Sequence, residues 1–353
     1  MTTTWHGSKL RAAVVGHGKV GRIRQACIEA HPRLELVSVC DVNGPSGPLP
    51  EGCRFHADWR DVLEEKPDLL FVCTTNEFIP DIAVCGLESG LHVFCEKPPG
   101  RSVEDVERMM VAEAAHPSSR LMFGFNHRYH QAIMDAKSLV DRKRLGNILW
   151  MRGVYGKAGG PGFDRNWRND PSRSGGGILI DQGIHMLDLF HLFVGEFQEI
   201  KSFVNTAYWN VPVEDNAFAI MRNRMGQTAM IHSSATQWRH TFLLDIYLEK
   251  GYLSISGILS STRTYGRESM IVARSRFDEE GYPLPNPQES VTHYDDDHSW
   301  ALEVDAFVRC VLENRTVESG SSRDALAVMK LVRSIYQGDA NGSMRPASPE
   351  SGP

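Results

Sequence analysis

The stretch Val14-Val15-Gly16-His17-Gly18-Lys19-Val20-Gly21-Arg22-Ile23 decides the fold of this chain. It has the pattern of a buried strand that ends in a glycine turn and continues into a helix. The spacing G-x-G-x-x-G is the fingerprint of a site for a dinucleotide pyrophosphate. Gly16 permits the tight turn, Gly18 lets the backbone approach the phosphates, and Gly21 lets helix and strand pack closely. The helix then offers unpaired N–H groups to the anion, so we assign cofactor binding to Gly16, His17, Gly18, Lys19, Val20 and Gly21.

The surroundings of this motif matter, because 31 glycines in 353 residues produce the pattern by chance now and then. Leu10 to Val15 is a nearly continuous apolar run, and Ile23 to Ala30 has helical periodicity. Strand-like and helix-like segments then alternate along the chain, which predicts βαβ units and a parallel sheet. We therefore expect an α/β fold whose N-terminal Rossmann dinucleotide-binding domain covers residues 1–128. Its later elements are expected at 34–41, 68–75, 79–89, 91–95, 102–115 and 121–125.

The second predicted strand ends in Asp41, which lies 20 residues after Gly21 (41 − 21). A dinucleotide fold places there the carboxylate that accepts hydrogen bonds from the adenosine ribose. Because a carboxylate repels a 2′-phosphate, Asp41 favours NAD over NADP. Two alternatives stay open: Asp41 only starts a turn, or the neighbouring Arg22 and Arg24 admit NADP.

Composition excludes several classes of protein. The formal net charge is −6, so nucleic acid is not expected as the main partner. The sequence has no run of about 18 apolar residues, so we expect no membrane span. Residues 1–11 lack the apolar core of a signal peptide. Seven cysteines without a C-x-x-C pair are typical of reduced thiols, and we expect a cytoplasmic protein.

Ligands of a parallel sheet bind at the carboxyl ends of its strands. Thr74, Thr75 and Asn76 follow one predicted strand, and Glu96 and Lys97 follow the next. We assign all five to the cofactor site. Lys97 also has two interpretations: a solvated loop cation, or a donor that binds a substrate hydroxyl beside the nicotinamide.

The segment after the first domain supplies the candidate substrate site. Three polar residues follow the strand at 121–125 and are expected to face the cleft, and a strand at 147–156 leads into a long loop, 157–177. Loops this long are uncommon unless they bind something, and arginines suit phosphate or carboxylate groups. The alternative is a solvated loop with internal salt bridges. The candidate substrate-binding residues are Asn126, His127, Arg128, Tyr155, Lys157, Arg165, Trp167 and Arg168.

Residues 178–194 are predicted to form a helix in which Asp181 and His185 are four apart and share one face. An imidazole can take the proton when a secondary alcohol is oxidised, and a carboxylate can orient it. The alternative is a core histidine paired with a helix-face carboxylate. We expect no metal, because His191 is turned away from His185 and too few ligands remain.

The remainder, from 198 to 272, alternates as strands and predicts a large open, mostly antiparallel sheet. One face of this sheet would expose apolar side chains, so we expect a homodimer or homotetramer through it. Helices are predicted at 299–313 and 323–336. The second domain is therefore assigned to residues 129–337, followed by a flexible tail at 338–353.

The chain resembles the Gfo/Idh/MocA family, named for glucose–fructose oxidoreductase and inositol dehydrogenase. The resemblance depends on the glycine motif, Asp41, Glu96-Lys97-Pro98, Gly124-Phe125-Asn126-His127-Arg128 and the segment from Gly175 to His185. It implies a Rossmann domain, an open-sheet substrate domain, and a catalytic set of Lys97, Asp181 and His185. It is nearest to members of sugar and surface-polysaccharide pathways. One departure is Thr74-Thr75-Asn76-Glu77-Phe78, where many relatives have proline and then histidine after the asparagine.

These observations predict an NAD-dependent oxidoreductase that acts on a sugar, cyclitol, sugar phosphate or nucleotide sugar, and the arginines of the loop suit an anionic substrate. Two alternatives remain. Some relatives use tightly held NAD to hydrolyse glycosides through transient oxidation, and a cofactor sensor would need only the glycine loop.

Overall fold

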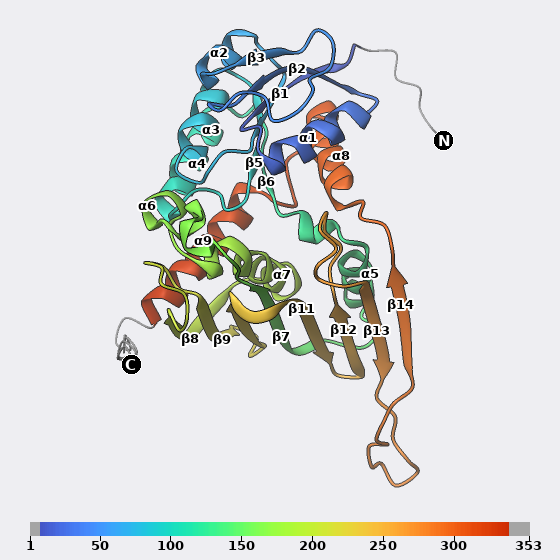
Figure 1. Cartoon of the computed structure of the whole chain (residues 1–353). Helices are drawn as coiled ribbons and strands as arrows, with labels where there is room; N and C mark the ends of the chain where they lie inside the picture. Colours follow the sequence, from blue (N-terminus) through green and yellow to red (C-terminus); the bar gives the residue numbers. More distant parts are fainter. Residues whose placement is uncertain (1–7, 339–353) are drawn as a thin grey trace, which may run out of the picture. The chain divides into compact units, whose positions relative to one another are not determined.

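A computed structural model describes residues 8–338 of the chain (Figure 1). The chain divides into two compact units. The first contains the residues up to Asn126 together with Ser299–Leu326, and the second contains His127–His298 together with the residues from Ala327 on. The segment Ser299–Leu326 therefore joins the first unit, although the sequence placed it in the second domain. The expected tail lies, apart from Gly338, outside the described residues.

The first unit contains a six-stranded parallel sheet in the order β3-β2-β1-β4-β5-β6. The strands β4 and β6 are buried along their whole length, as expected where helices cover both faces of a parallel sheet. The strands are β1 (Leu10–Val15), β2 (Leu34–Cys40), β3 (Arg54–His56), β4 (Leu69–Val72), β5 (His92–Glu96) and β6 (Leu121–Gly124). The helices are α1 (Lys19–Ala30), α2 (Trp59–Glu64), α3 (Ile79–Glu88), α4 (Val103–Ala115) and α8 (Ser299–Leu312). The predicted Rossmann domain is confirmed; β3 and α2 had not been predicted.

The strand order of this sheet reverses at β1, which pairs with β2 on one side and with β4 on the other. In doubly wound sheets ligands bind outside the carboxyl ends of the strands at this point. Gly16 follows β1, Asp41 follows β2, and Thr74 lies just beyond β4. The topology thus brings the three predicted parts of the cofactor site to one edge of one sheet.

The second unit contains an eight-stranded mixed sheet in the order β14-β13-β12-β11-β7-β10-β9-β8. All neighbours are antiparallel except β7 and β10, which are parallel. The mostly antiparallel sheet is thereby confirmed. The strands are β7 (Ile148–Ala158), β8 (Phe197–Asn205), β9 (Asn216–Asn223), β10 (Thr228–Ser234), β11 (Thr236–Leu248), β12 (Gly251–Ser256), β13 (Glu268–Arg274) and β14 (Glu289–Tyr294).

Helix α7 (Ile184–Val194) lies on one face of this sheet (Figure 1). Contact is close because β7 has a glycine there: a Cβ at Gly153 would stand 2.5 Å from Met186 and 2.9 Å from Phe190. The unit also contains α5 (Gln131–Asp141) and α9 (Ser322–Gly338), whose first residues belong to the first unit. Three short helical turns lie within the predicted loop, namely η2 (Phe163–Arg165), η3 (Trp167–Asn169) and α6 (Pro171–Ser174).

One helical stretch among the described residues, Pro171–Val194, is long and apolar enough to cross a membrane by length and composition alone. No such stretch was predicted from the sequence; the helical turns before α7 lengthen the apolar stretch. Within the structure, 67% of its most apolar window is buried. That degree of burial matches a core helix of the second unit.

Candidate functional site

The glycine turn at the end of β1 is shaped by contacts that only glycine permits. Gly16 has φ +92°, and a Cβ on it would stand 2.6 Å from the backbone of Cys73. A Cβ on Gly21 would stand 1.9 Å from the carbonyl oxygen of Gly16. Around Gly18, by contrast, no atom lies within 4 Å of the Cβ position, and no side chain caps α1 there. The turn therefore leaves its open side at Gly18, beside the exposed Lys19 and the half-buried Val20, where a pyrophosphate would meet the helix N-terminus.

The His17 side chain is buried and joins the glycine turn to the loop after β2. Its Nδ1 accepts the N–H of Ser46 at 3.0 Å, so its Nε2 carries the proton and donates to Oε1 of Gln25. Because both ring nitrogens have partners inside the unit, the His17 ring has a structural role. At the cofactor site, His17 can then contribute only its backbone.

Asp41 is held in place by the same turn. Its carboxylate accepts the backbone N–H of His17 at 2.8 Å and that of Asn43 at 2.9 Å. Of the two arginines that kept NADP open, Arg22 is exposed, but Arg24 is fully buried. Arg24 therefore cannot meet a 2′-phosphate, which corrects that part of the sequence interpretation.

Further polar groups lie at the carboxyl end of β4. The hydroxyl oxygen of Thr74 is buried, and within residues 8–338 it has no hydrogen-bond partner. It adjoins the glycine turn, because the Thr74 nitrogen lies 2.8 Å from the Cβ position of Gly16. Thr75 is half-buried and Asn76 is buried. An orphaned hydroxyl beside an open glycine turn and a fixed carboxylate fits a dinucleotide.

Glu96 turns into the interior of the first unit. Arg24 donates to it from Nε at 2.7 Å and to Glu303 of α8 from Nη2 at 2.5 Å. The guanidinium also lies over the ring of Phe94, 4.4 Å from the centroid. Glu96 thus anchors the end of β5, and the next residue, the half-buried Lys97, begins the loop that follows.

The second unit brings together His127, Tyr155 and His185, which come from three different elements. The rings of His127 and His185 are stacked, with centroids 3.7 Å apart and planes 16° apart. The Nε2 of His127 lies 3.0 Å from the hydroxyl of Tyr155 on β7. Burial, the neighbouring Tyr265 and the charge of Asp181 raise the pKa of Tyr155 well above its usual range, so its hydroxyl stays protonated.

The two residues on either side of His127 have structural partners. Arg128 makes a bidentate, buried ion pair with Asp188 of α7, at 2.8 and 2.6 Å. Asn126, in the first unit, donates to the hydroxyl of Ser299 at 3.2 Å. Both were predicted to bind substrate; these contacts fix the backbone that leads to His127.

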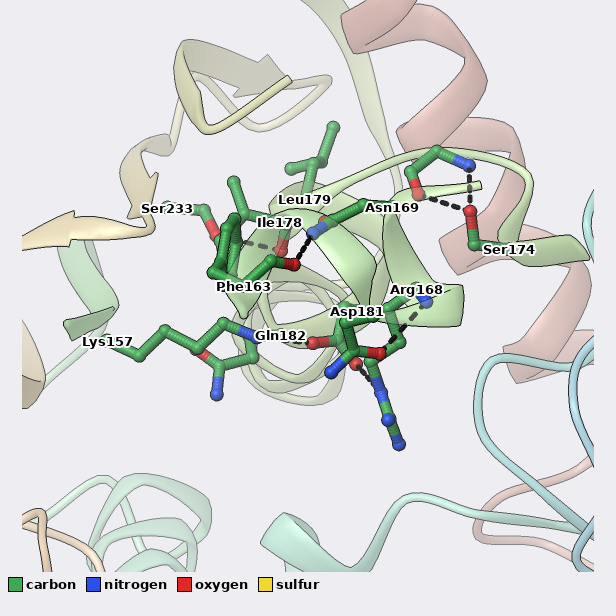
Figure 2. A network of polar contacts seen from close by, with 12 residues as sticks. Lys157, Phe163, Arg168, Asn169, Ser174, Ile178, Leu179, Asp181, Gln182 and Ser233 are labelled. Carbon is green, nitrogen blue, oxygen red and sulfur yellow. Dashed lines mark hydrogen bonds and ion pairs between the residues drawn. The ribbon is translucent and has the colours of Figure 1, made fainter. Parts of the chain in front are cut away.

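Asp181 lies between two cations (Figure 2). Its carboxylate accepts Nζ of Lys157 at 2.8 Å and Nε of Arg168 at 3.0 Å. We name these three residues the Asp181 cluster. Arg168 lies over the ring of Trp167, 4.6 Å from its centroid, and Arg165 is exposed. Two of the predicted loop residues, Lys157 and Arg168, therefore contact one of the predicted catalytic residues.

Asp181 belongs to a π-helical turn, η4 (Leu179–Gly183), which sequence periodicity did not indicate. The turn is held by the buried Glu214, whose carboxylate accepts the N–H groups of Gly177 and Leu179 at 2.8 and 2.9 Å. Burial raises the pKa of Glu214, against these hydrogen bonds and one from Tyr336. Such turns occur frequently at functional sites.

Sequence reasoning also missed Gln182 and Tyr265. The Gln182 amide donates to the Tyr265 hydroxyl at 2.7 Å, and the Tyr265 ring lies 5.4 Å from that of Tyr155. Gln182 follows Asp181 directly, which was the available signal; no pattern marked Tyr265. No group of three His, Cys, Asp or Glu residues in the described part of the chain is arranged to hold a metal ion.

Sequence profiles of known families match both units. Residues 10–125 match the profile described as oxidoreductase family, NAD-binding Rossmann fold, and residues 133–254 match the GFO/IDH/MocA C-terminal domain.

Among curated relatives, D-glucoside 3-dehydrogenase of Escherichia coli is 26% identical over 97% of this chain and 99% of its own length. Glucose-6-phosphate 3-dehydrogenase of Bacillus subtilis is 28% identical over 56% of this chain and 58% of its own. Among solved structures, levoglucosan dehydrogenase in complex with NADH and levoglucosan matches with a TM-score of 0.82. That match has 19% identity and covers 95% of this chain and 98% of the other.

Proposed function

The chain belongs to the Gfo/Idh/MocA family of NAD-binding oxidoreductases, and we propose that it transfers a hydride between a secondary alcohol of a sugar and nicotinamide. One observation carries this proposal: the second unit contains both the stacked rings of His127 and His185 and the carboxylate of Asp181, which two cations bind. A protein that only senses the cofactor would need the glycine turn, but it would not need His127, His185 and Asp181.

The proposed reaction separates a hydride from a proton. The bound nicotinamide supplies the hydride acceptor. His185 takes the proton from the hydroxyl oxygen, and Lys97 donates a hydrogen bond to that oxygen and disfavours its protonated form. Asp181 holds Lys157 and Arg168 in place, and these two cations orient the sugar. The alcohol carbon loses its hydride and becomes a carbonyl.

The proposed cofactor is NAD, because the Asp41 carboxylate is fixed by two backbone N–H groups where a 2′-phosphate would stand. The proposed substrate is a hexose derivative. Both curated relatives described above are named for oxidation at position 3, and one of them for a phosphorylated sugar. Cations around Asp181 are compatible with a substrate that carries an anionic group.

We further propose a cytoplasmic homo-oligomer assembled through the outer face of the second sheet. Phe203, Phe218 and Ile220 are 74%, 43% and 54% exposed on the adjacent strands β8 and β9. Apolar side chains side by side on a sheet are typical of a subunit interface. Light scattering should give a dimer or tetramer, and Ile220→Lys should reduce the mass to that of a monomer.

The test of the activity is the absorbance of reduced nicotinamide after addition of free sugars, glycosides, cyclitols and sugar phosphates in turn. A rise with NAD for at least one sugar is expected. Release of free sugar from a glycoside at constant absorbance would instead identify a hydrolase that re-reduces its product.

A further inference from the structure

Four aromatic side chains of the second unit lie in a row that begins at Phe163, beside Lys157 of the Asp181 cluster. We name Phe163, Tyr208, Trp209 and Trp238 the aromatic strip. Ring centroids are 4.7 Å apart between Phe163 and Trp209, 5.1 Å between Tyr208 and Trp209, and 4.8 Å between Tyr208 and Trp238. None of the four has a role in the reaction proposed above.

The aromatic strip is continuous with the Asp181 cluster through Lys157. Its Nζ lies 2.8 Å from the carboxylate of Asp181 and 5.6 Å from the ring centroid of Phe163. Figure 2 shows Phe163 above Lys157 and Asp181. A molecule that reaches Lys157 from the Asp181 side therefore extends toward the strip.

The inner ring of the strip is held before any ligand arrives. The indole N–H of Trp209 donates to the carbonyl of Ala235 at 3.0 Å. A Cβ on Gly159 would stand 1.9 Å from the Trp209 ring, so the ring packs directly on glycine backbone. The carboxylate of Asp215 accepts three successive backbone N–H groups, of residues 207, 208 and 209, each at 2.8 Å. Such preorganisation lowers the entropy that binding would lose.

The rings of Tyr208 and Trp238 at the outer end of the strip are exposed to solvent. The hydrophobic effect favours burial of such rings and therefore does not account for their exposure. Tyr208 is 64% exposed and Trp238 is 61% exposed. Trp238 also has φ +55°, a backbone conformation that is an outlier for a bulky residue. It lies where β11 departs from its register with β7, between Thr236 and Thr241. Strained backbone that presents a side chain to solvent is typical of ligand sites.

We propose that the aromatic strip is a subsite for a second sugar ring, linked glycosidically to the ring that is oxidised. A sugar ring has an apolar C–H face that stacks on the electron-rich face of an aromatic ring, and a hydroxyl edge that needs polar partners. The exposed Arg239 beside Trp238 and Lys157 beside Phe163 supply such partners. This inference rests on the proposed function and makes the substrate a disaccharide or larger glycoside.

The test is calorimetric titration of the full chain, with and without NAD, by maltose, cellobiose and methyl glucoside. Wild type should bind at least one disaccharide more tightly than methyl glucoside. Trp238→Ala and Tyr208→Ala should each raise the disaccharide Kd about tenfold, the scale of one aromatic contact. Their methyl glucoside Kd should stay within about twofold, and Trp238→Phe should retain most of the disaccharide affinity. Tyr282→Ala is the matched control, because Tyr282 is 69% exposed outside the strip.

Equal weakening of both kinds of ligand, or a wild type that binds neither disaccharide more tightly than methyl glucoside, would overturn the proposal. So would a fall in the mass of the assembly on Trp238→Ala with unchanged sugar affinity, because the strip would then be a subunit contact. A chain that binds disaccharides through the strip but reduces no nicotinamide would refute the dehydrogenase and leave the subsite intact.

Discussion

His127 and His185 stack almost parallel, at a distance where two positive charges repel. His127 also shares a hydrogen bond with Tyr155. The stacking and this hydrogen bond hold both imidazoles in one orientation in the second unit. In the reaction proposed above, a ring held in this way would take the proton from the substrate oxygen.

Replacing His185 by Asn should lower kcat for sugar oxidation by about 10²–10⁴-fold, because the proton would have no acceptor. The rise of kcat/KM with pH that reports the base should disappear in this variant. Steady-state kinetics across pH 5–9 measures both effects. His232→Asn is the matched control, since that ring also stacks on an aromatic neighbour, Phe218, at 4.1 Å. Equal loss in both variants would contradict the assignment.

Replacing Lys97 by Met keeps the length of the side chain and removes its charge. We expect kcat/KM for the sugar to fall at least about 10²-fold, while the affinity for NAD changes little. Cofactor titration by fluorescence separates the two quantities. Lys9→Met, at an exposed position of the same unit, should match wild type. Turnover within about tenfold of wild type in Lys97→Met would exclude Lys97 from the chemistry.

Replacing Asp41 by Ala should raise KM for NAD and lower KM for NADP. The carboxylate that accepts the ribose hydroxyls is lost, and so is the charge that repels a 2′-phosphate. The exposed Arg22 remains to meet that phosphate. Kinetics with both cofactors measure the ratio, which we expect to change about tenfold or more. An unchanged ratio would assign cofactor choice to another residue.

Replacing Arg24 by Met should destabilise the protein by about 3–5 kcal/mol, because Glu96 and Glu303 would stay buried without their cation. Urea denaturation monitored by tryptophan fluorescence measures the change. Arg108→Met breaks an exposed pair with Asp81 and serves as control. Similar midpoints for the two variants would show that the buried arrangement contributes little.

The pH dependence of stability should report Glu268. Burial raises its pKa, but the hydrogen bond and charge of His130 and two backbone N–H groups outweigh burial and leave the pKa below its ordinary 4.5. A lowered carboxyl pKa stabilises the folded state fully above 4.5 and ceases to do so as pH falls through the folded value.

Glu268→Gln should therefore be less stable than wild type by roughly 2 kcal/mol at pH 7, and the gap should narrow below pH 4.5. Denaturation of both proteins from pH 7 to 3.5 tests this. Glu199→Gln, in an exposed pair with Arg222 that solvent screens, should show a much smaller difference in stability from wild type. A difference in stability between wild type and Glu268→Gln that grows as the pH falls would contradict the predicted direction.

Most elements of both units followed from local sequence, because strand alternation, glycine turns and helix caps act over a few residues, whereas β3, α2, η4 and β14 were not predicted. The Ser102 cap of α4 is one example, since its side chain accepts the N–H of Asp105, three residues later. The assembly of the candidate site did not follow in the same way. Helical spacing placed Asp181 on the face of His185, and the spacing cannot show that Lys157 and Arg168 bind its carboxylate from 24 and 13 residues away.

Contacts across long sequence separations were likewise invisible. Burial of Arg24 depends on Glu303, 279 residues later, so the sequence left Arg24 as a candidate for cofactor binding. The parallel pairing of β7 with β10 joins strands that are separated in sequence by the helices α6 and α7 and by the strands β8 and β9. The hydrogen bonds by which Glu214 holds η4 were not predicted for the same reason, because they join residues 37 and 35 positions apart.

The pairing of Arg24 with Glu303 also constrains how the protein is made. Residues up to Asn126 leave the ribosome long before α8 is synthesised, so until then Arg24 lacks the helix that covers it and one of its two carboxylates. We therefore expect residues 1–126 to be incomplete as an independent domain, and a protein cut after Asn126 should express poorly. Supplying residues 299–326 through a short linker should restore its solubility, since the missing helix and its acid would return together.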